Sequence, residues 1–418
     1  MVRYAIVGAG QRGAGYAEWI ARRPGARVVA VAEPRAHRRE RLAREHGVTH
    51  VFPSWEELAA APRLADAAIV STQDTEHVGP AIALARKGYH LLVEKPLAPT
   101  PGECAELVEA VTAAGVLFAV CHVMRYRPYT RLVKKLVDDG RIGGIMSVQH
   151  LEPVGHWHYA HSYVRGNWRR SDLASFMLLA KSGHDIDWLR HIVGDRIERV
   201  SSFGSLRHFT PRHAPPGSAD RCLDCAVEPD CPYSATRLYL GMVRAGRTGW
   251  PVSVLADEVT EASVTTALRE GPYGRCVYRS DNDVVDHQVV AMEFAGGATA
   301  TFTMTAFTPH VDRRTQVFGT RGFLDGDGTH VRLHDFVTET TEVLTAPADG
   351  QDTDAGHAGG DSGLMTAFTT AVETGDPAHI LSGPAESLES HLAVFAAERA
   401  RLSGTVEHVR PGTGDLSA

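Results

Sequence analysis

The sequence has little cysteine, no long apolar run and no excess of basic residues, and each shortage excludes a class of protein. Six cysteines in 418 residues are too few for a disulfide framework, so a reducing cytoplasm is the expected compartment. No apolar stretch approaches transmembrane length, and an apolar strand that begins next to Met1 leaves no room for a signal peptide. A net charge of −7 without a basic block argues against nucleic acid or anionic membranes as partners.

The chain length and composition instead suit a soluble enzyme. A chain of 418 residues is long for one hydrophobic core, so two domains are expected. The apolar fraction of 43% is enough for two sizeable cores, and a charged fraction of 22% is ordinary.

An apolar strand at the N-terminus runs into a glycine motif, and a helix-like stretch follows it. In this context Gly8 suits a tight turn, Gly10 lets a pyrophosphate approach the backbone, and Gly13 lets helix and strand pack closely. The free N–H groups at the helix start then attract phosphates. Gln11 and Arg12, between the last two glycines, belong to the same predicted dinucleotide site.

A second apolar strand, residues 27–32, ends in Glu33 about 20 residues after the glycines. An acid there accepts hydrogen bonds from ribose hydroxyls and repels a 2′-phosphate, which favours NAD. Arg35, Arg38 and Arg39 follow at once and could hold that phosphate instead, although they also fit the solvated face of a charged helix. NAD is therefore the predicted cofactor, and NADP stays open.

The triplet Glu94-Lys95-Pro96 ends another apolar strand, residues 90–93. Strands that alternate with helices over about 120 residues predict a doubly wound parallel sheet, whose carboxyl edge binds ligands. Lys95 could hold a hydroxyl or carbonyl oxygen at that edge, and Pro96 is the residue type that best tolerates a cis peptide. The alternative is a surface turn with an incidental ion pair.

In this order the motifs resemble the glucose–fructose oxidoreductase, inositol dehydrogenase and MocA family of NAD(P)-dependent oxidoreductases, over most of the chain. The motifs are Gly8-x-Gly10-x-x-Gly13, Ser71-Thr72 with His77, Glu94-Lys95-Pro96, Arg125-Tyr126-Arg127-Pro128 and Gly183-His184-Asp185-Ile186-Asp187. The resemblance implies an N-terminal Rossmann domain followed by a C-terminal α/β domain with a large, mostly antiparallel sheet. It also implies hydride transfer at a secondary alcohol of a sugar or cyclitol, with Lys95 and His184 in the active site.

The expected organisation follows from that resemblance. Residues 1–122 would form the NAD-binding domain. Residues 123–380 would form the substrate and oligomerisation domain, with a cysteine-rich insertion near 205–240. Residues 381–418 would form a C-terminal helix that packs back on the first domain. We expect a homodimer or homotetramer assembled through the second-domain sheet.

The second half of the chain also carries local signals. Residues 289–294 and 298–307 alternate apolar and polar residues around a Gly-Gly turn and predict a hairpin. Asp361 is a candidate N-cap for a helix to about residue 372. His357, in the glycine-rich stretch before it, could lie over the pocket or in a solvated linker.

The residues that follow Ser182 predict a helix independently of the resemblance. Apolar residues at positions 186, 189, 192 and 193 share one face, and Gly194 suits the C-terminal end. Ser182 and Asp185 fit a capping box, which favours a structural role for Asp185. His184 would then lie in the first turn, where the helix dipole keeps the imidazole neutral and able to accept a hydroxyl proton. The alternative is a capped core histidine.

One position departs from the family pattern. Many members carry an aspartate four residues before the histidine, where this chain has Ala180. Lys181 is adjacent, could bind an anionic or strongly polar group, and is the third candidate catalytic residue. The departure keeps two other functions open, namely redox-assisted cleavage or epimerisation of a glycoside with tightly bound NAD, and non-catalytic sensing of NAD or a sugar.

Residues 155–169 combine four aromatic rings, three histidines and several amide or guanidinium donors. Sugars stack on rings while forked donors hold vicinal hydroxyls, so this segment predicts a carbohydrate site. The predicted substrate-binding residues, beside Lys95 and His184, are Arg125, His158, Arg165 and Trp168. An amphipathic loop packed on the sheet is the alternative. A metal site at the histidines is disfavoured because no acid is placed to complete it.

Half of the cysteines lie within ten residues, at Cys222, Cys225 and Cys231. C-x-x-C with a third cysteine is typical of a structural zinc loop, with a fourth ligand from His208, His213 or elsewhere in the chain. The spacing is not that of a standard finger, so free thiols in a packed loop are the alternative. Prolines around the motif mark a long irregular insertion that a metal would help to order.

Overall fold

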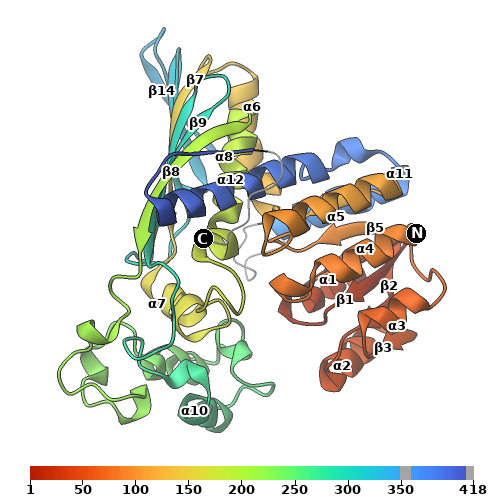
Figure 1. Cartoon of the computed structure of the whole chain (residues 1–418), viewed down its shortest axis with the longest axis vertical. Helices are drawn as coiled ribbons and strands as arrows, with labels where there is room; N and C mark the ends of the chain where they lie inside the picture. The colour runs from red at the N-terminus through yellow and green to blue at the C-terminus, as the bar shows by residue number, and fades with distance from the viewer. Residues whose placement is uncertain (349–358, 411–418) are drawn as a thin grey trace.

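Two sheets organise the molecule, whose computed structural model describes residues 1–348 and 359–410 (Figure 1). The first sheet has six strands in the order β3-β2-β1-β4-β5-β6, and the second has nine in the order β14-β13-β12-β11-β7-β10-β9-β8-β15. The expected fold, a Rossmann sheet plus an α/β part with a large, mostly antiparallel sheet, is confirmed. His357 lies outside the described residues.

All neighbouring strands of the first sheet are parallel. Its strands are β1 (Val2–Val7), β2 (Ala26–Ala32), β3 (His50–Phe52), β4 (Ala67–Val70), β5 (His90–Val93) and β6 (Phe118–Val120). Its helices are α1 (Gln11–Arg22), α2 (Ala36–His46), α3 (Trp55–Ala60), α4 (Val78–Arg86) and α5 (Pro101–Ala114). The sequences of β4 and β5 are almost entirely apolar because helices cover both faces of a parallel sheet, so that both sides of each strand are buried. The strand order reverses between β1 and β4, which is where such sheets bind their ligands.

The second sheet is antiparallel except where β10 meets β7. Its strands are β7 (Ile145–Pro153), β8 (Ile197–Ser205), β9 (His287–Phe294), β10 (Thr299–Thr305), β11 (Arg314–Gly319), β12 (Gly322–Gly326), β13 (His330–Asp335), β14 (Thr340–Thr345) and β15 (Glu407–His408). The antiparallel pair β9 and β10 confirms the predicted hairpin.

Helices cover one face of the second sheet (Figure 1). Helix α8 (Gly183–Val193) packs on β7 and β10, and α12 (Pro384–Ser403) packs on β8. The opposite face exposes apolar side chains, among them Phe203 and Val289, which are 70% and 41% exposed. Assembly through this face stays a prediction.

Two C-terminal helices reach back to the first sheet. Helix α11 (Gly360–Thr374) contacts α1 and β1, and Tyr4 in β1 bonds Thr369 of α11 at 2.8 Å. Helix α12 contacts α5, and the Leu97 amide donates to His391 Nε2 at 3.0 Å. The crevice between the two sheets is therefore held by chain segments that come from both ends of the sequence.

The insertion between Ser205 and His287 contains no strand and carries its own small apolar cluster. Its longest helix is α10 (Glu261–Glu270), and a shorter helix is α9 (Gly241–Arg244). It lies beside the short helix α7 (His156–Tyr159), at the end of the molecule away from β14 (Figure 1). The irregular region is thus longer than the predicted 205–240.

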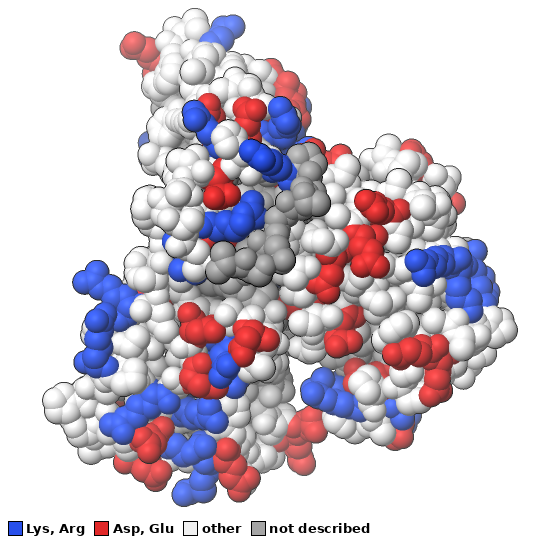
Figure 2. Space-filling view, in the orientation of Figure 1, with Lys and Arg blue, Asp and Glu red and all other residues white. Residues whose placement is uncertain are grey.

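Charge is mixed on the face of the molecule that Figure 2 shows. Acidic and basic side chains are interspersed on the face shown in Figure 2, on the insertion as on the rest. None of the described helices has both the length and the apolar character to cross a bilayer.

Candidate active site

The glycine motif forms a turn that only glycine can make. Gly8 has a φ of +91°, and a Cβ there would lie 2.5 Å from the Ser71 carbonyl oxygen. A Cβ on Gly13 would lie 1.9 Å from the Gly8 carbonyl oxygen. Helix α1 starts after Gly10 without a side-chain cap, so the helix N-terminus is open to an anion. The turn and helix start therefore fit a dinucleotide pyrophosphate.

Glu33 lies beside this turn, where the ribose of such a cofactor would be. Its carboxylate accepts from the Ala9 amide at 2.8 Å and the Arg35 amide at 2.9 Å. Arg39 Nη1 donates to the Glu33 carbonyl oxygen at 2.6 Å and so does not face a phosphate. Arg38 Nη1 lies 3.9 Å from where a Cβ of Gly10 would stand, so Arg38 is the arginine closest to the glycine turn by this measure.

Replacing Glu33 by glutamine should raise the affinity for NADP relative to NAD by about tenfold, because one charge repelling the 2′-phosphate is removed while Arg38 stays. Titration calorimetry with both cofactors measures the ratio. The double variant Glu33→Gln/Arg38→Ala is the control and should lose the gain. An unchanged ratio in the single variant would show that Glu33 does not discriminate the cofactors.

Lys95 follows β5, with a cis peptide bond to Pro96. Its Nζ donates to the carbonyl oxygen of Ala180, in the segment that leads into α8. Burial lowers the pKa of Lys95 to about 8, against raising effects of Asp74 and Glu94, and Lys181 lowers it further. A half-buried lysine with a lowered pKa is therefore held at the carboxyl edge of the first sheet.

The neighbouring strand end positions this lysine. Ser71 Oγ donates to the Gly8 carbonyl oxygen at 2.9 Å, and Thr72 Oγ1 donates to a backbone carbonyl oxygen of its own loop. His77 Nδ1 lies 2.6 Å from the Pro96 carbonyl oxygen, and the ring is buried. Two predicted cofactor residues, Ser71 and His77, thus fix the glycine turn and the lysine turn.

Glu94 and Arg12 form an ion pair that extends to α11. Arg12 Nε donates to Glu94 at 2.5 Å, and Arg12 Nη2 lies 2.6 Å from Asp361. Asp361 lies inside the first turn of α11, whose N-cap is Gly359, so the predicted N-cap role of Asp361 is wrong. Its carboxylate instead joins α11 to the cofactor edge.

His184 lies in the first turn of α8, and the predicted helix and its end at Gly194 are confirmed. The predicted capping box is wrong, because Ser182 makes no side-chain cap and a π-helical turn, Leu178–Ser182, leads directly into α8. Asp185 is buried and accepts from Arg313 and, at 3.1 Å, from His150. Single π-helical turns, such as Leu178–Ser182, are frequent at functional sites.

His122 lies near both Lys95 and His184. The centroids of the His122 and His184 rings are 6.1 Å apart, and the rings meet edge to face. Burial lowers the pKa of His122 to about 3, and Lys95 is among the charges that lower it further. The structure therefore gathers the lysine and the histidine around one buried region between the two sheets.

Lys181 lies next to this region but is not a free charge. Its Nζ is 3.1 Å from Glu152 Oε1, and Glu152 Oε2 is 2.8 Å from Arg313 Nη2. Three ion pairs thus link Lys181, Glu152, Arg313 and Asp185 into one network. Positive and negative side chains alternate along this network, which is largely buried. Sequence reasoning missed Glu152 and Arg313, since neither lies in a motif and only the pairing of β7 with β11 brings them together.

Three predicted substrate residues have other tasks. Arg125 is buried in a bidentate ion pair with Asp187, with distances of 2.8 and 2.6 Å. Arg165 is buried and donates to the carbonyl oxygens of Arg275 and Tyr233, both at 2.8 Å. Trp168 is 38% exposed, and its ring lies 6.2 Å from that of Tyr163. The donors of the two arginines named here bond to the fold, although Arg165 also lines the cavity described below, and a role in substrate binding stays a prediction.

His158, in the aromatic segment, is near enough to Lys181 for the charge of that lysine to act on its ring. Burial lowers the pKa of His158 well below its ordinary range, and Lys181 lowers it further. The ring lies 5.2 Å from His310 and 5.0 Å from Trp250. His158 is thus a neutral ring between the lysine and the insertion.

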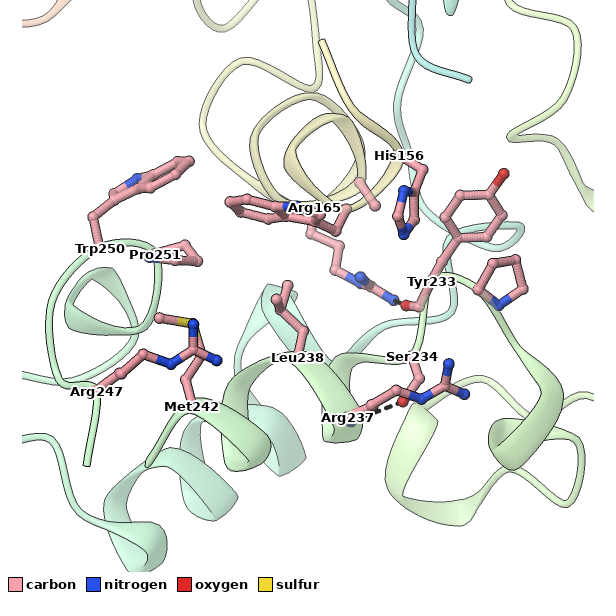
Figure 3. Close-up of a pocket in the computed structure, with 13 residues that line it drawn as sticks. His156, Arg165, Tyr233, Ser234, Arg237, Leu238, Met242, Arg247, Trp250 and Pro251 are labelled. Atoms are coloured by element: carbon pink, nitrogen blue, oxygen red, sulfur yellow. Dashed lines mark hydrogen bonds between the residues drawn. The ribbon is translucent and has the colours of Figure 1, made fainter. Parts of the chain in front are cut away.

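A cavity of about 490 Å³ lies behind these rings, between α7 and the insertion (Figure 3). Trp157 and Trp250, whose ring centroids are 5.5 Å apart, form part of its wall. Arg247, on the same side of the view as Trp250, and Arg237 also line it, and all three come from the insertion (Figure 3). The aromatic and cationic lining has the character predicted for residues 155–169, but nine of the 13 lining residues come from an insertion that the sequence did not connect to them.

The predicted zinc ligands are not assembled as foreseen. Within residues 1–348 and 359–410, no three His, Cys, Asp or Glu side chains already form a metal-ligand set. His208 and His213 pack against each other, with ring centroids 5.5 Å apart, and Tyr278 is within 3.3 Å of His208. Neither histidine lines the cavity on which the cysteines converge.

Comparison with known proteins agrees with this geometry. The family model described as "Oxidoreductase family, NAD-binding Rossmann fold" matches residues 2–122, and "Oxidoreductase family, C-terminal alpha/beta domain" matches residues 134–397. A 2,7-anhydro-N-acetylneuraminate hydratase from Escherichia coli is 29% identical over 50% of this chain and 55% of its own length. A scyllo-inositol 2-dehydrogenase (NAD(+)) from Bacillus subtilis is 28% identical over 65% of this chain and 78% of its own length.

Solved structures share the whole architecture. The scyllo-inositol dehydrogenase of Lactobacillus casei with bound NAD(H) and scyllo-inositol superposes with a TM-score of 0.68 at 17% identity, over 98% of this chain and 99% of that one. At this identity the likeness shows the fold alone. The chain spans less than two thirds of the length of several curated relatives that it matches, for example 55% of the hydratase.

Proposed function

The chain belongs to the glucose–fructose oxidoreductase, inositol dehydrogenase and MocA family of oxidoreductases, and on that basis we propose that it is an NAD-dependent dehydrogenase of a secondary alcohol on a sugar or cyclitol. One observation carries the proposal: the half-buried ammonium of Lys95 stands at the cofactor edge and reaches the segment that presents His184. Both groups are of the type that the oxidation of an alcohol needs.

In this mechanism the two side chains divide the work. The Lys95 ammonium donates a hydrogen bond to the reacting oxygen and holds it in place. His184 accepts the hydroxyl proton as the C–O bond becomes a carbonyl. NAD, when bound at the glycine turn, supplies the hydride acceptor. The proton thus passes to imidazole and the hydride leaves from the same carbon, so the reaction balances without another reactant.

The rest of the substrate would lie towards Lys181 and His158. Lys181 would bind a polar or anionic substituent, since its pairing with Glu152 fixes the ammonium without removing its charge. The name of one relative, a hydratase of an anhydro-N-acetylneuraminate, supports an acidic sugar derivative as one class to test. Because a hydratase causes no net oxidation of its substrate, the same name leaves open the second candidate function, redox-assisted cleavage or epimerisation of a glycoside with tightly bound NAD.

A substrate screen distinguishes the two functions. Purified protein is incubated with NAD or NADP and a panel of sugars, anhydrosugars, sugar acids and cyclitols, and both NADH and sugar products are measured. Net NADH with one class of alcohol supports the dehydrogenase. Product without net NADH, from protein that carries NAD through purification, supports the second function. NAD binding without conversion of any class would instead favour a sensing protein.

We also infer where the protein works and how it is assembled. The protein would be a cytoplasmic homo-oligomer that binds neither nucleic acid nor membranes. Its domains would be divided near residues 122 and 380. The exposed apolar residues on the open face of the second sheet support assembly there. The mixed charge of the surface in Figure 2 supports the absence of a nucleic-acid partner.

A further inference from the structure

Four of the six cysteines line one small cavity in the insertion, well apart from the cofactor edge in sequence. They are Cys222, Cys225, Cys231 and Cys276. The cavity measures about 20 Å³, which is the space of a single small atom or water. Beside the four cysteines, its lining includes the polar or charged residues Arg165, Ser218, Arg221, Glu228 and Tyr278.

Tight turns bring the first three cysteines together. A 3-10 turn, Cys222–Asp224, places the Cys225 amide 3.3 Å from the Cys222 carbonyl oxygen. In the next turn the Glu228 amide donates to the Cys225 carbonyl oxygen at 3.2 Å. In a third turn the Cys231 amide donates to the Glu228 carbonyl oxygen at 3.1 Å. A C-x-x-C pair in a tight turn followed closely by another cysteine is a common arrangement in structural zinc sites.

A short ladder supplies the fourth cysteine. Arg221 and Arg275 form an antiparallel bridge, and the Cys276 amide donates to the Asp220 carbonyl oxygen at 2.8 Å. Because side chains alternate along paired strands, Cys222 and Cys276 lie on the same face of this bridge, as diagonal neighbours. The chain thus contributes Cys276 from 45 residues beyond Cys231 in sequence, a distance that hid it from motif reading.

The charge balance around the cavity also favours an anionic centre. Arg165 is buried, and its Nη2 lies 3.5 Å from Cys222 Sγ. Its other partners are the neutral carbonyl oxygens of Arg275 and Tyr233, and no carboxylate of residues 1–348 or 359–410 forms an ion pair with it, although Glu228 also lines the cavity. A zinc ion with four thiolates has a net charge of −2, which would offset this buried cation.

We propose that Cys222, Cys225, Cys231 and Cys276 bind one structural zinc ion. Binding converts four thiols to thiolates and releases four protons, so no redox partner is needed. The thiols are not yet arranged as ligands in the described chain, so the side chains must rotate, and Cys222 Sγ must turn from Arg165 towards the cavity centre. The insertion would gain a cross-link between its two ends.

The zinc would stabilise the wall of the large cavity as well. Arg165, which lies beside the cysteines, donates to Tyr233, and Tyr233 lines the 490 Å³ cavity in Figure 3. The insertion otherwise depends on a small apolar cluster, and a metal is a usual substitute where a core is small. The site is structural and does not depend on the proposed dehydrogenase activity.

Metal analysis of the full-length protein tests the proposal. Protein purified under reducing conditions without chelators should contain one zinc per chain by mass spectrometry of the metal. Cys276→Ser should lose the zinc, whereas Cys104→Ser, which changes a buried cysteine bonded only to the Ala98 carbonyl oxygen, should keep it. His208→Ala should also keep it.

A second measurement covers a variant that fails to fold. Zinc is removed from the wild-type protein with a chelator, and Co²⁺ is added while visible absorption is recorded. Intense thiolate-to-cobalt bands and the d–d bands of tetrahedral cobalt are expected. Wild-type protein with neither zinc nor a cobalt spectrum would overturn the proposal, as would a disulfide between any two of these cysteines in reduced cytosolic preparations or zinc retained by Cys276→Ser.

Discussion

Replacing Lys95 by methionine is expected to lower kcat/KM for the alcohol substrate by about 100- to 1,000-fold while NAD still binds, because the loss of one positioned donor at a reacting oxygen costs this much. Methionine keeps the length and apolar stem of lysine, so the packing near Ala180 is disturbed little. The measurement is initial-rate kinetics on the substrate identified by the screen, with NAD affinity determined separately.

The pH profile gives the same prediction a second readout. The pKa of Lys95 is lowered to about 8 by burial, so the ammonium form is present below that value and lost as pH rises through it. If the charged form holds the reacting oxygen, kcat/KM should fall on the alkaline side near pH 8. The acidic side should fall with protonation of the base, assigned to His184.

A surface lysine gives the matched control. Lys135 forms an exposed i,i+4 pair with Asp139, and Lys135→Met should leave kcat/KM and its pH profile unchanged. A Lys95→Met protein that binds NAD and retains most of its turnover would remove Lys95 from the mechanism. The sensing function would then become the better explanation of the fold.

Local sequence predicted those parts of the site that local geometry determines. The glycine turn could be foreseen because Gly8 needs a positive φ and Gly13 leaves no room for a Cβ. The lysine edge could be foreseen because Lys95 directly follows an apolar parallel strand, and the end of such a strand fixes where its next residues lie. In each case a residue and its neighbours in sequence are sufficient.

The errors concern residues whose partners are far away in sequence. Asp185 has the spacing of a capping residue, but it pairs instead with Arg313, which directly precedes β11, and with His150 in β7. Asp361 stands at a helix start, yet Arg12 pairs with it from the opposite end of the chain. Buried ion pairs of this kind override local preference, and sequence spacing does not reveal them.

The aromatic segment shows the same limit. Its composition indicated a polar aromatic site, and the structure does place Trp157 and His158 beside a cavity. The sequence could not show that Arg165 turns into the insertion or that Trp250 completes the wall, because both depend on how an irregular segment folds back. The residue types in this segment predicted the chemical character of the site, but the directions of the side chains could not be predicted from the sequence.

Replacing Arg125 by methionine is expected to destabilise the fold by about 3 to 5 kcal/mol, since it leaves the buried carboxylate of Asp187 without its ionic partner. Arg125 also donates to the Leu381 carbonyl oxygen, so the same change loosens the segment that leads to α12. Thermal unfolding followed by circular dichroism measures the loss. The exposed pair of Arg244 and Glu261 supplies the control, and Arg244→Met should leave the melting temperature nearly unchanged.

The dependence of this loss on pH tests its electrostatic origin. Although burial raises the pKa of Asp187, Arg125 and its other partners hold it below its ordinary value in the native protein, so its stabilising effect is present above about pH 4 and fades as pH falls. In Arg125→Met the same carboxyl is buried without the guanidinium and should accept a proton readily. The stability difference between variant and wild type should therefore shrink between pH 7 and pH 4. A difference that stays constant over this range would instead indicate that Arg125 stabilises the fold through packing and its bond to Leu381.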